Sequence, residues 1–302
     1  MVYEAYSGGK ISATIWLPAQ QPVGVVQIVH GIAEHMARYD DFATYLNSLG
    51  YVVVGEDHMG HGATAALGGV KGYFAGGWWA AIQDTYQLMK RIVAQYPEIP
   101  YVMFGHSMGS FMVRSILARY PDSGMSGCIV CGTGWQPEVI LGAGRALASA
   151  ICKLSDPQKP NAILHNLAFG AYNKRVDHPR TEHDWLTRDA AIVDAYAADP
   201  MCGFRASAGL MSDMFDGIAY IQSKPALEAM NKQLPVLFIA GGDDPVGSYG
   251  DGVRKAFDAF RTAGMQNVHM KLYPMGRHEI LNEINKNEVY EDVGQWLRST
   301  LK

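Results

Sequence analysis

Short apolar runs alternate with segments of helical periodicity through most of the chain. Runs rich in β-branched residues begin near residues 23, 51, 101, 127, 234 and 268, and most are followed by segments with a period near 3.6. This alternation predicts a mostly parallel sheet with helices on both faces. Two strand-like runs around Ser7, Gly8 and Gly9 predict an antiparallel hairpin at one edge of that sheet.

The pattern changes between residues 135 and 224. Long helical stretches such as 140–154 and 184–200 stand there, with no convincing strand. The sequence therefore predicts an α/β core of residues 1–134 and 225–302. Residues 135–224 are predicted to form a helical insertion, here called the cap, over the carboxyl edge of the sheet, where open α/β sheets bind ligands.

Composition and charge narrow the class of protein. Of 302 residues, 48% are hydrophobic and 18% charged, which is typical of a globular chain. The net charge of -4 provides no basic field, so no nucleic-acid partner is expected. Because the first residues lack a signal-peptide pattern and no apolar run approaches the length of a membrane span, the prediction is a cytoplasmic protein without stable membrane insertion. The pattern does not specify an oligomeric state.

Four cysteines are too few to form a disulfide framework in a chain of this length: Cys128, Cys131, Cys152 and Cys202. Cys128 and Cys131 form a C-x-x-C motif within the predicted buried strand "GCIVC". Side chains three apart on a strand point to opposite faces, so these thiols are predicted to be core residues and not a redox or metal pair.

The motif "GHSMG" interrupts an apolar run at residues 105–109. Residues 101–104 are predicted to form a strand and residues from 108 onward a helix, which places Ser107 on a strand-to-helix corner. Glycines at two residues on either side give the G-x-S-x-G spacing of a nucleophile elbow, where a sharp turn leaves little room for side chains.

A nucleophilic serine needs a base and a group that orients the base. In the arrangement that follows such an elbow, an acid and then a histidine stand after later strands. Asp243 and Asp244 follow the strand near residue 234, and His278 follows the last strand. Both aspartates fit the loop, so the pattern leaves the choice between them open.

Acyl transfer also requires N–H donors for an oxyanion. One donor is predicted to be the backbone N–H of Met108, at the start of a helix. The other is predicted to be Ile32, in the loop "HGIAEH" at residues 30–35 after the first buried strand, here called the oxyanion loop.

These motifs resemble the monoacylglycerol lipase and lysophospholipase group of α/β-hydrolases, which some schemes group with serine aminopeptidases. The resemblance rests on four stretches: "HGIAEH", "EDHMGHG", "GHSMGS" and "GRHEILNE". It implies an α/β-hydrolase fold and a serine esterase that forms an acyl-enzyme with monoacylglycerol-like or lysophospholipid-like substrates, and no cofactor or metal is expected. Aligning the family's G-x-x-D onto Gly241 favours Asp244 as the acid.

One position departs from the family pattern. Ala33 stands where the family usually has glycine, and a methyl group there could tilt the oxyanion loop. Two other functions share the fold: an aminopeptidase with the same triad, and an inactive hydrolase fold that serves as a binding protein.

Several other residues receive structural interpretations. Glu34 and Glu279 are interpreted as braces for the loops. The histidines near the motifs are expected to shape loops through hydrogen bonds, and those of the cap to be solvated. The histidines near the motifs are His30, His35, His58, His61 and His106. Those of the cap are His165, His178 and His183. Apolar residues of the cap are expected either to line an acyl pocket or to pack the cap onto the core: Trp135, Leu141, Phe169, Leu210, Met211, Met214 and Phe215.

Overall fold

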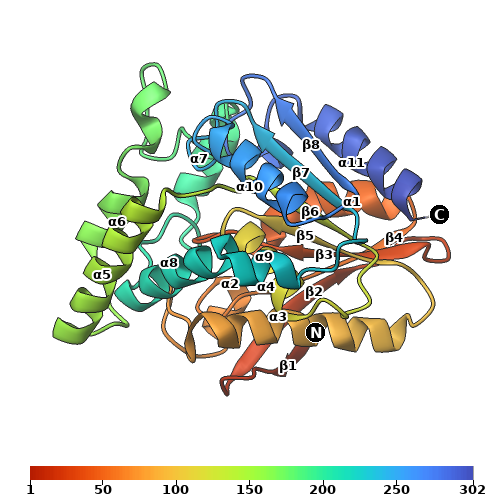
Figure 1. Ribbon diagram of the computed structural model, residues 1–302, viewed down its shortest axis with the longest axis horizontal. Coiled ribbons are helices and arrows are strands. Elements are labelled where there is room, and N and C mark those ends of the chain that lie inside the picture. Colours follow the sequence, from red (N-terminus) through yellow and green to blue (C-terminus); the bar gives the residue numbers. More distant parts are fainter. Residues whose placement is uncertain (302) are drawn as a thin grey trace.

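The computed structural model describes residues 1–301, which form a central sheet flanked by helices, with a further group of helices to one side (Figure 1). Within these residues the sheet has eight strands in the order β1-β2-β4-β3-β5-β6-β7-β8. The strands are Val2–Glu4 (β1), Lys10–Trp16 (β2), Gly24–Val29 (β3), Tyr51–Asp57 (β4), Tyr101–His106 (β5), Gly127–Cys131 (β6), Val236–Gly241 (β7) and Val268–Tyr273 (β8). β2 pairs antiparallel with β1 and β4, and the other pairs are parallel. The predicted α/β-hydrolase fold class and the edge hairpin are confirmed.

The continuous apolar runs follow from burial of the central strands on both faces. Every residue of β3, β4, β5, β6 and β7 is buried. Successive side chains of β3 enter opposite cores, with Val25 on one face and Val26 on the other. Cys128 and Cys131 of β6 divide between the same two cores and are free thiols, as the strand period predicted.

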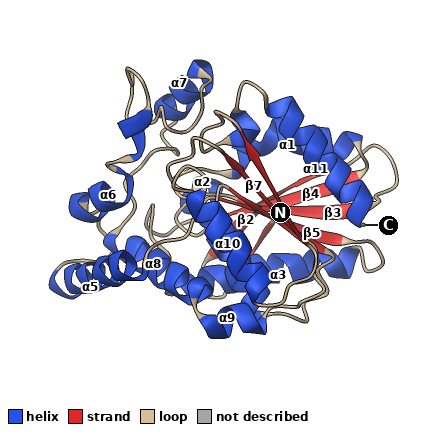
Figure 2. Cartoon of the chain, turned by 45° about the horizontal axis from the view of Figure 1, so that its top comes forward, coloured by secondary structure: helices blue, strands red, loops and turns tan. Residues whose placement is uncertain are grey.

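Helices of the core cover both faces of the sheet (Figure 2). One face packs against Asp40–Ser48 (α1) and Lys286–Thr300 (α11). The other packs against Gly77–Gln95 (α3), Met108–Arg119 (α4) and Asp251–Thr262 (α10). Shorter elements complete the loops: Met36–Tyr39 (η1), Gly62–Ala66 (α2) and Ile280–Asn282 (η3).

The segment between β6 and β7 is helical. Its elements are Glu138–Leu154 (α5), Ala162–Phe169 (α6), Tyr172–Arg175 (η2), Ala190–Ala198 (α7), Ala208–Gln222 (α8) and Lys224–Ala229 (α9). α8 packs against α5 and also against α3 and α4, so it links these helices to the core. The division of the chain at residues 135 and 224 stays a prediction.

The predicted helix over residues 184–200 is wrong in its first part. Residues 184–189 form a turn followed by irregular backbone, and α7 begins at Ala190. The carboxylate of Asp189 accepts hydrogen bonds from the backbone N–H groups of Ala191 and Ile192, which makes Asp189 the N-cap and stops the helix from extending backward. Among residues 1–301, no helix combines the length and apolar character that a membrane span requires.

Gly109 allows α4 to approach the sheet closely. A Cβ atom at this position would lie 1.9 Å from the carbonyl oxygen of Val29 on β3. We therefore expect Gly109→Ala to lower the free energy of unfolding by about 3 kcal/mol or more, measured by urea denaturation.

The matched control is Gly142→Ala on α5, where an added Cβ would meet no atom within 4 Å. Because alanine is the better helix former, this change should raise the free energy of unfolding by about 0.5–1 kcal/mol. Similar effects of the two substitutions would contradict the close packing of α4 on β3.

Candidate active site

Ser107 lies on a strained turn between β5 and α4. Its φ of 54° is in the region that non-glycine residues rarely adopt, and its backbone N–H donates to the carbonyl of Cys131 at 3.0 Å. An added Cβ at Gly105 would lie 2.4 Å from the carbonyl oxygen of Gly109, so the turn requires glycine there. The corner predicted from "GHSMG" is therefore present, with the backbone strain expected of a functional position.

Asp244 and His278 meet at the carboxyl ends of β7 and β8. His278 Nδ1 lies 3.0 Å from both carboxylate oxygens of Asp244, and both side chains are buried. When Nδ1–H donates to Asp244, the Nε2 atom of His278 carries no proton and is free to accept one. His278 and Ser107 line the same chamber. The neighbouring Asp243 is exposed and lines a separate pocket that includes neither Ser107 nor His278.

Ile32 and Met108 lie beside Ser107, and all three line one apolar chamber. Met108 is the first residue of α4, so its N–H is one of the free donors at the helix start. Ile32 precedes Ala33, whose φ of 55° is in the left-handed region. An alanine in that conformation costs about 1–2 kcal/mol that glycine avoids. Ala33, which replaces the glycine usual in the family, therefore introduces backbone strain into the oxyanion loop.

A buried group of charges joins the loops around Ser107. Glu34 accepts hydrogen bonds from the backbone N–H of Gly31 at 2.5 Å and from Arg38 at 2.8 Å. Arg38 also donates two bonds of 2.6 Å to Glu279, the neighbour of His278. Burial alone would raise the pKa of Glu34 and of Glu279, but Arg38 and, for Glu34, a hydrogen bond to His106 hold both pKa values below their usual range. The braces predicted from the sequence thus act through Arg38.

His106 links this charge group to the loop that carries His278. Its Nδ1 lies 3.2 Å from Glu34, and its Nε2 lies 3.4 Å from the backbone carbonyl of His278. Burial would lower the pKa of His106, but the hydrogen bond to Glu34 and the two nearby carboxylates outweigh burial and raise it. Because both ring nitrogens face oxygen acceptors, the imidazolium form donates twice.

The other histidines near the motifs shape loops. His30 Nε2 accepts the backbone N–H of His58 at 3.0 Å, and the His58 ring packs against that of His30 at a tilt of 35°. Burial lowers the pKa of His30, and lowers that of His61 to about 3, so both rings are neutral near pH 7. In the cap, the expectation of solvated histidines is wrong for His165 and His183, which are half-buried and line a chamber.

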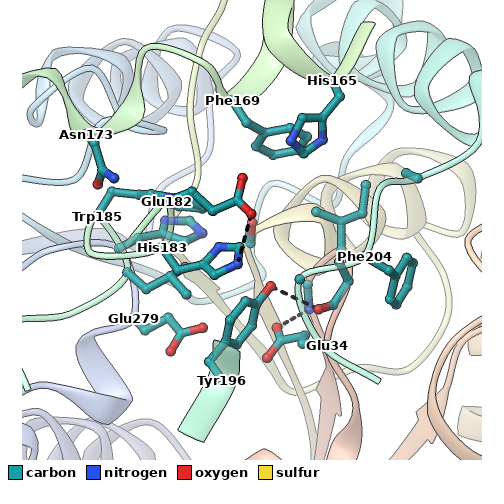
Figure 3. Close-up of a pocket in the computed structure, with 18 of the residues that line it drawn as sticks. Glu34, His165, Phe169, Asn173, Glu182, His183, Trp185, Tyr196, Phe204 and Glu279 are labelled. Atoms are coloured by element: carbon teal, nitrogen blue, oxygen red, sulfur yellow. Dashed lines mark hydrogen bonds and ion pairs between the residues drawn. The ribbon is translucent and has the colours of Figure 1, made fainter. Parts of the chain in front are cut away.

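Two chambers open from Ser107 among residues 1–301, with volumes of about 910 and 1070 Å³ including the space open to solvent. The first, here called the polar chamber, has many hydrogen-bonding side chains among its lining residues, interspersed with apolar ones such as Phe169 and Leu186 (Figure 3). The hydrogen-bonding residues include Glu34, His165, Asn166, Asn173, Glu182, His183 and Tyr196. The second, the apolar chamber, runs between α5, α6 and α8. Both share Ile32, Ser107 and Phe169, so the serine lies where they join.

The apolar cap residues divide between the two expected roles. Leu141, Phe169, Met214 and Phe215 line the apolar chamber. Leu210 and Met211 are buried in the core near the start of α8, and Trp135 lines a different pocket. Sequence reasoning missed further lining residues: Ile140, Gly144, Leu167 and Ile218. Helical spacing could have found Gly144 from Leu141 and Ile218 from Met214.

One group of side chains in the described residues 1–301 has the donor types of a metal site. His35, Asp199 and Cys202 bring a nitrogen, an oxygen and a sulfur within 4.8 Å of one another. His35 Nε2 lies within hydrogen-bond distance of Asp199, at 2.8 Å. This contact between the oxyanion loop and the cap is enough to bring the side chains together. That the protein needs no metal stays a prediction.

The chain is similar over nearly its whole length to proteins named as lipases and esterases. A family model described as serine aminopeptidase, S33, matches residues 20–285. The monoacylglycerol lipase of Mycolicibacterium smegmatis is 30% identical over 305 residues, which cover 99% of this chain and 96% of that protein. The monoglyceride lipase of Mus musculus is 26% identical over 296 residues, covering 96% and 87%. A solved structure of a thermostable carboxyl esterase from Bacillus coagulans in complex with glycerol has a TM-score of 0.94 at 31% identity, covering 100% of this chain and 98% of that one.

The raised pKa of His106 predicts a pH dependence of stability. The pKa of His106 is higher in the folded than in the unfolded state, so its protonated form stabilises the fold. This contribution to the free energy of unfolding is complete below the unfolded pKa of about 6.5 and is lost as pH rises through the folded pKa. We expect the stability difference between wild type and His106→Gln, measured as free energy of unfolding in urea from pH 6 to 9, to shrink with rising pH.

The control for this series is His269→Gln, at an exposed position on β8. Its curve should run parallel to that of the wild type. A parallel curve for His106→Gln as well would show that the imidazolium form of His106 does not stabilise the fold.

Proposed function

Because the chain belongs to the serine aminopeptidase S33 family, which here includes relatives named monoacylglycerol lipase, we propose that it is a serine carboxylic-ester hydrolase acting on monoacylglycerol-like or lysophospholipid-like esters. That it is a hydrolase of the lipase and esterase type follows from the family and the fold. The observation that carries the finer proposal is the junction of an apolar and a polar chamber at Ser107.

The proposed reaction uses the triad in two steps. Ser107 Oγ attacks the ester carbonyl while His278 Nε2 takes the hydroxyl proton, and Asp244 holds the imidazole and stabilises its positive charge. The N–H groups of Ile32 and Met108 donate to the oxyanion. His278 then returns the proton to the leaving alcohol, which leaves an acyl group on Ser107. Water, activated by the same histidine, hydrolyses that acyl-enzyme.

The two chambers suggest how an ester would be oriented. An alkyl chain gains free energy from the apolar chamber, at about 0.8 kcal/mol for each methylene buried. A polyol or other hydroxylated leaving group finds hydrogen-bonding partners in the polar chamber, where Asn173 and His165 project inward (Figure 3). The related esterase from Bacillus coagulans was solved in complex with glycerol, which agrees with such a leaving group.

An aminopeptidase activity is the second candidate, because the family description names one. A free amine at the site would require carboxylates to bind it. Glu34 and Glu279 line the polar chamber, but both are paired with Arg38. Glu182 is largely exposed and lies 3.9 Å from His183. In an aminopeptidase substrate the free amine belongs to the acyl part, and none of the described carboxylates that line the polar chamber is both buried and free of a partner, so the charge distribution favours an ester substrate.

Ser107→Ala is the direct test of the proposal. It should lower ester turnover by about 10⁴-fold or more while the protein stays folded, because the triad acts as a unit. A fluorophosphonate probe should label the wild type and fail to label the variant. Turnover and labelling that survive in the variant, or wild-type cleavage of aminoacyl amides in preference to esters, would refute the proposed esterase.

The neighbouring aspartates provide a matched control for the triad acid. Asp244→Asn should lower turnover by about 10³–10⁴-fold, since an amide cannot stabilise the correct imidazole tautomer. Asp243→Asn, which carries the same change one residue away, should stay within a few-fold of wild type because Asp243 faces a separate pocket. The reverse ranking would move the acid to Asp243.

The apolar chamber predicts a preference for acyl chains longer than acetate. Two extra buried methylenes should raise kcat/KM about tenfold, measured on monoesters from acetate to laurate. Gly144 on α5 lines this chamber, so Gly144→Leu should shift the optimum toward shorter chains.

The control is Gly142→Leu, an exposed position on the same helix where an added side chain starts in open space. It should leave the chain-length profile unchanged. A flat profile in the wild type, or identical profiles in both variants, would mean that the acyl chain binds elsewhere.

A further inference from the structure

The oxyanion loop is held on both sides of Ile32. On the core side, the carboxylate of Glu34 accepts the backbone N–H of Gly31. On the cap side, the carbonyl oxygen of Ala33 accepts the hydroxyl of Tyr196 at 2.9 Å and the backbone N–H of Gly203 at 3.0 Å. Ile32 lies between these two fixed points.

The cap-side contacts come from one short stretch of chain. Tyr196 is on α7, and Gly203 follows seven residues later in the same segment. Between them, Asp199 pairs with His35, which is two residues beyond Ala33. The segment 196–203 therefore contacts the oxyanion loop on both sides of Glu34.

Ala33 is the residue that needs such support. Its left-handed φ is unfavourable for an alanine, so a free loop would relax toward negative φ. That rotation would turn the peptide groups on either side of Ala33. One of them joins Ile32 to Ala33, so the rotation would also shift Ile32 and the Gly31–Ile32 peptide that carries its N–H. Two donors on the Ala33 carbonyl oppose the rotation, because a relaxed loop would lose both hydrogen bonds.

Tyr196 is itself fixed in place. Its ring is buried and lies 4.7 Å from the guanidinium of Arg38, which in turn is bonded to Glu34 and Glu279. Figure 3 shows the Tyr196 hydroxyl directed at the loop backbone, beside Glu34. The cap-side and core-side supports of the loop are thus in contact with each other.

We propose that Tyr196 is a positioning residue of the proposed esterase, whose hydroxyl holds the strained Ala33 so that the N–H of Ile32 stays directed at the reacting carbonyl. This inference rests on the proposed function. In this proposal both the core and the cap form the oxyanion hole. The core supplies the N–H donor of Ile32, and Tyr196 on α7 of the cap holds the conformation of the oxyanion loop.

The test is a double-mutant cycle with Tyr196→Phe, Ala33→Gly and the double variant. Tyr196→Phe should lower kcat about tenfold, less than full loss of an oxyanion donor, with KM changed less than twofold. A trifluoromethyl ketone, which adds to Ser107 to form an oxyanion, should lose the same factor in affinity. In the Ala33→Gly background the effect of Tyr196→Phe should fall below about twofold, because glycine adopts the left-handed conformation without strain.

The control is Tyr220→Phe, a cap tyrosine on α8 whose ring packs against Trp79, away from the oxyanion loop, and which should behave as wild type. Tyr196 also lines the polar chamber, so it could instead contact the leaving group. In that case KM would rise, and the loss would be equal with and without the Ala33→Gly substitution. Either result would overturn the positioning role, as would an unchanged kcat.

Unfolding measurements separate this inference from the proposed function. The same four proteins should show coupling in the free energy of unfolding. Tyr196→Phe should be less destabilising beside the native Ala33, where the released loop relaxes and recovers its strain, than in the Ala33→Gly background. This coupling is expected even if the wild type hydrolyses no ester, which would refute the proposed function alone. Strictly additive effects on unfolding would refute the support of Ala33 by Tyr196.

Discussion

The buried guanidinium of Arg38 determines how the loops around Ser107 sit relative to one another. It lies between Glu34 of the oxyanion loop and Glu279 beside His278, and its side chain is 11% exposed. Without it, two buried carboxylates would face each other uncompensated, and removal of one partner from such a group typically costs about 3–5 kcal/mol. The loops that carry Ile32 and His278 are therefore held as one unit.

The sequence predicts the proposed reacting groups because their positions follow from strand order. Ser107, Asp244 and His278 each follow a parallel strand, and the carboxyl ends of parallel strands share one edge of a sheet. The choice between Asp243 and Asp244 cannot follow from the same argument, since both residues leave the same strand. It depends on the resemblance to a family, and the structure brings Asp244 to His278.

Contacts between the cap and the core are beyond the reach of pattern reading. Tyr196 and Ala33 are 163 residues apart, and no period or local motif connects them. The expectation that His165 and His183 are solvated fails because the sequence pattern does not show which residues of the cap face the chamber around Ser107. The false helix at residues 184–189 has a local signal against it: Asp189 precedes an alanine-rich run, as an N-cap does.

The insertion of the cap between β6 and β7 affects how the chain can fold. These strands pair directly, from Cys128 opposite Val236 to Cys131 opposite Ile239, although about a hundred residues intervene. Closing a flexible loop of that length costs on the order of 4 kcal/mol in chain entropy before the pair gains anything. Helix formation by α5 and α8 and their mutual packing shorten the effective loop, so a cap that folds early lowers the barrier to completing the sheet. The same segment that helps to line the candidate active site would then also determine when β7 and β8, and with them Asp244 and His278, join the rest of the sheet.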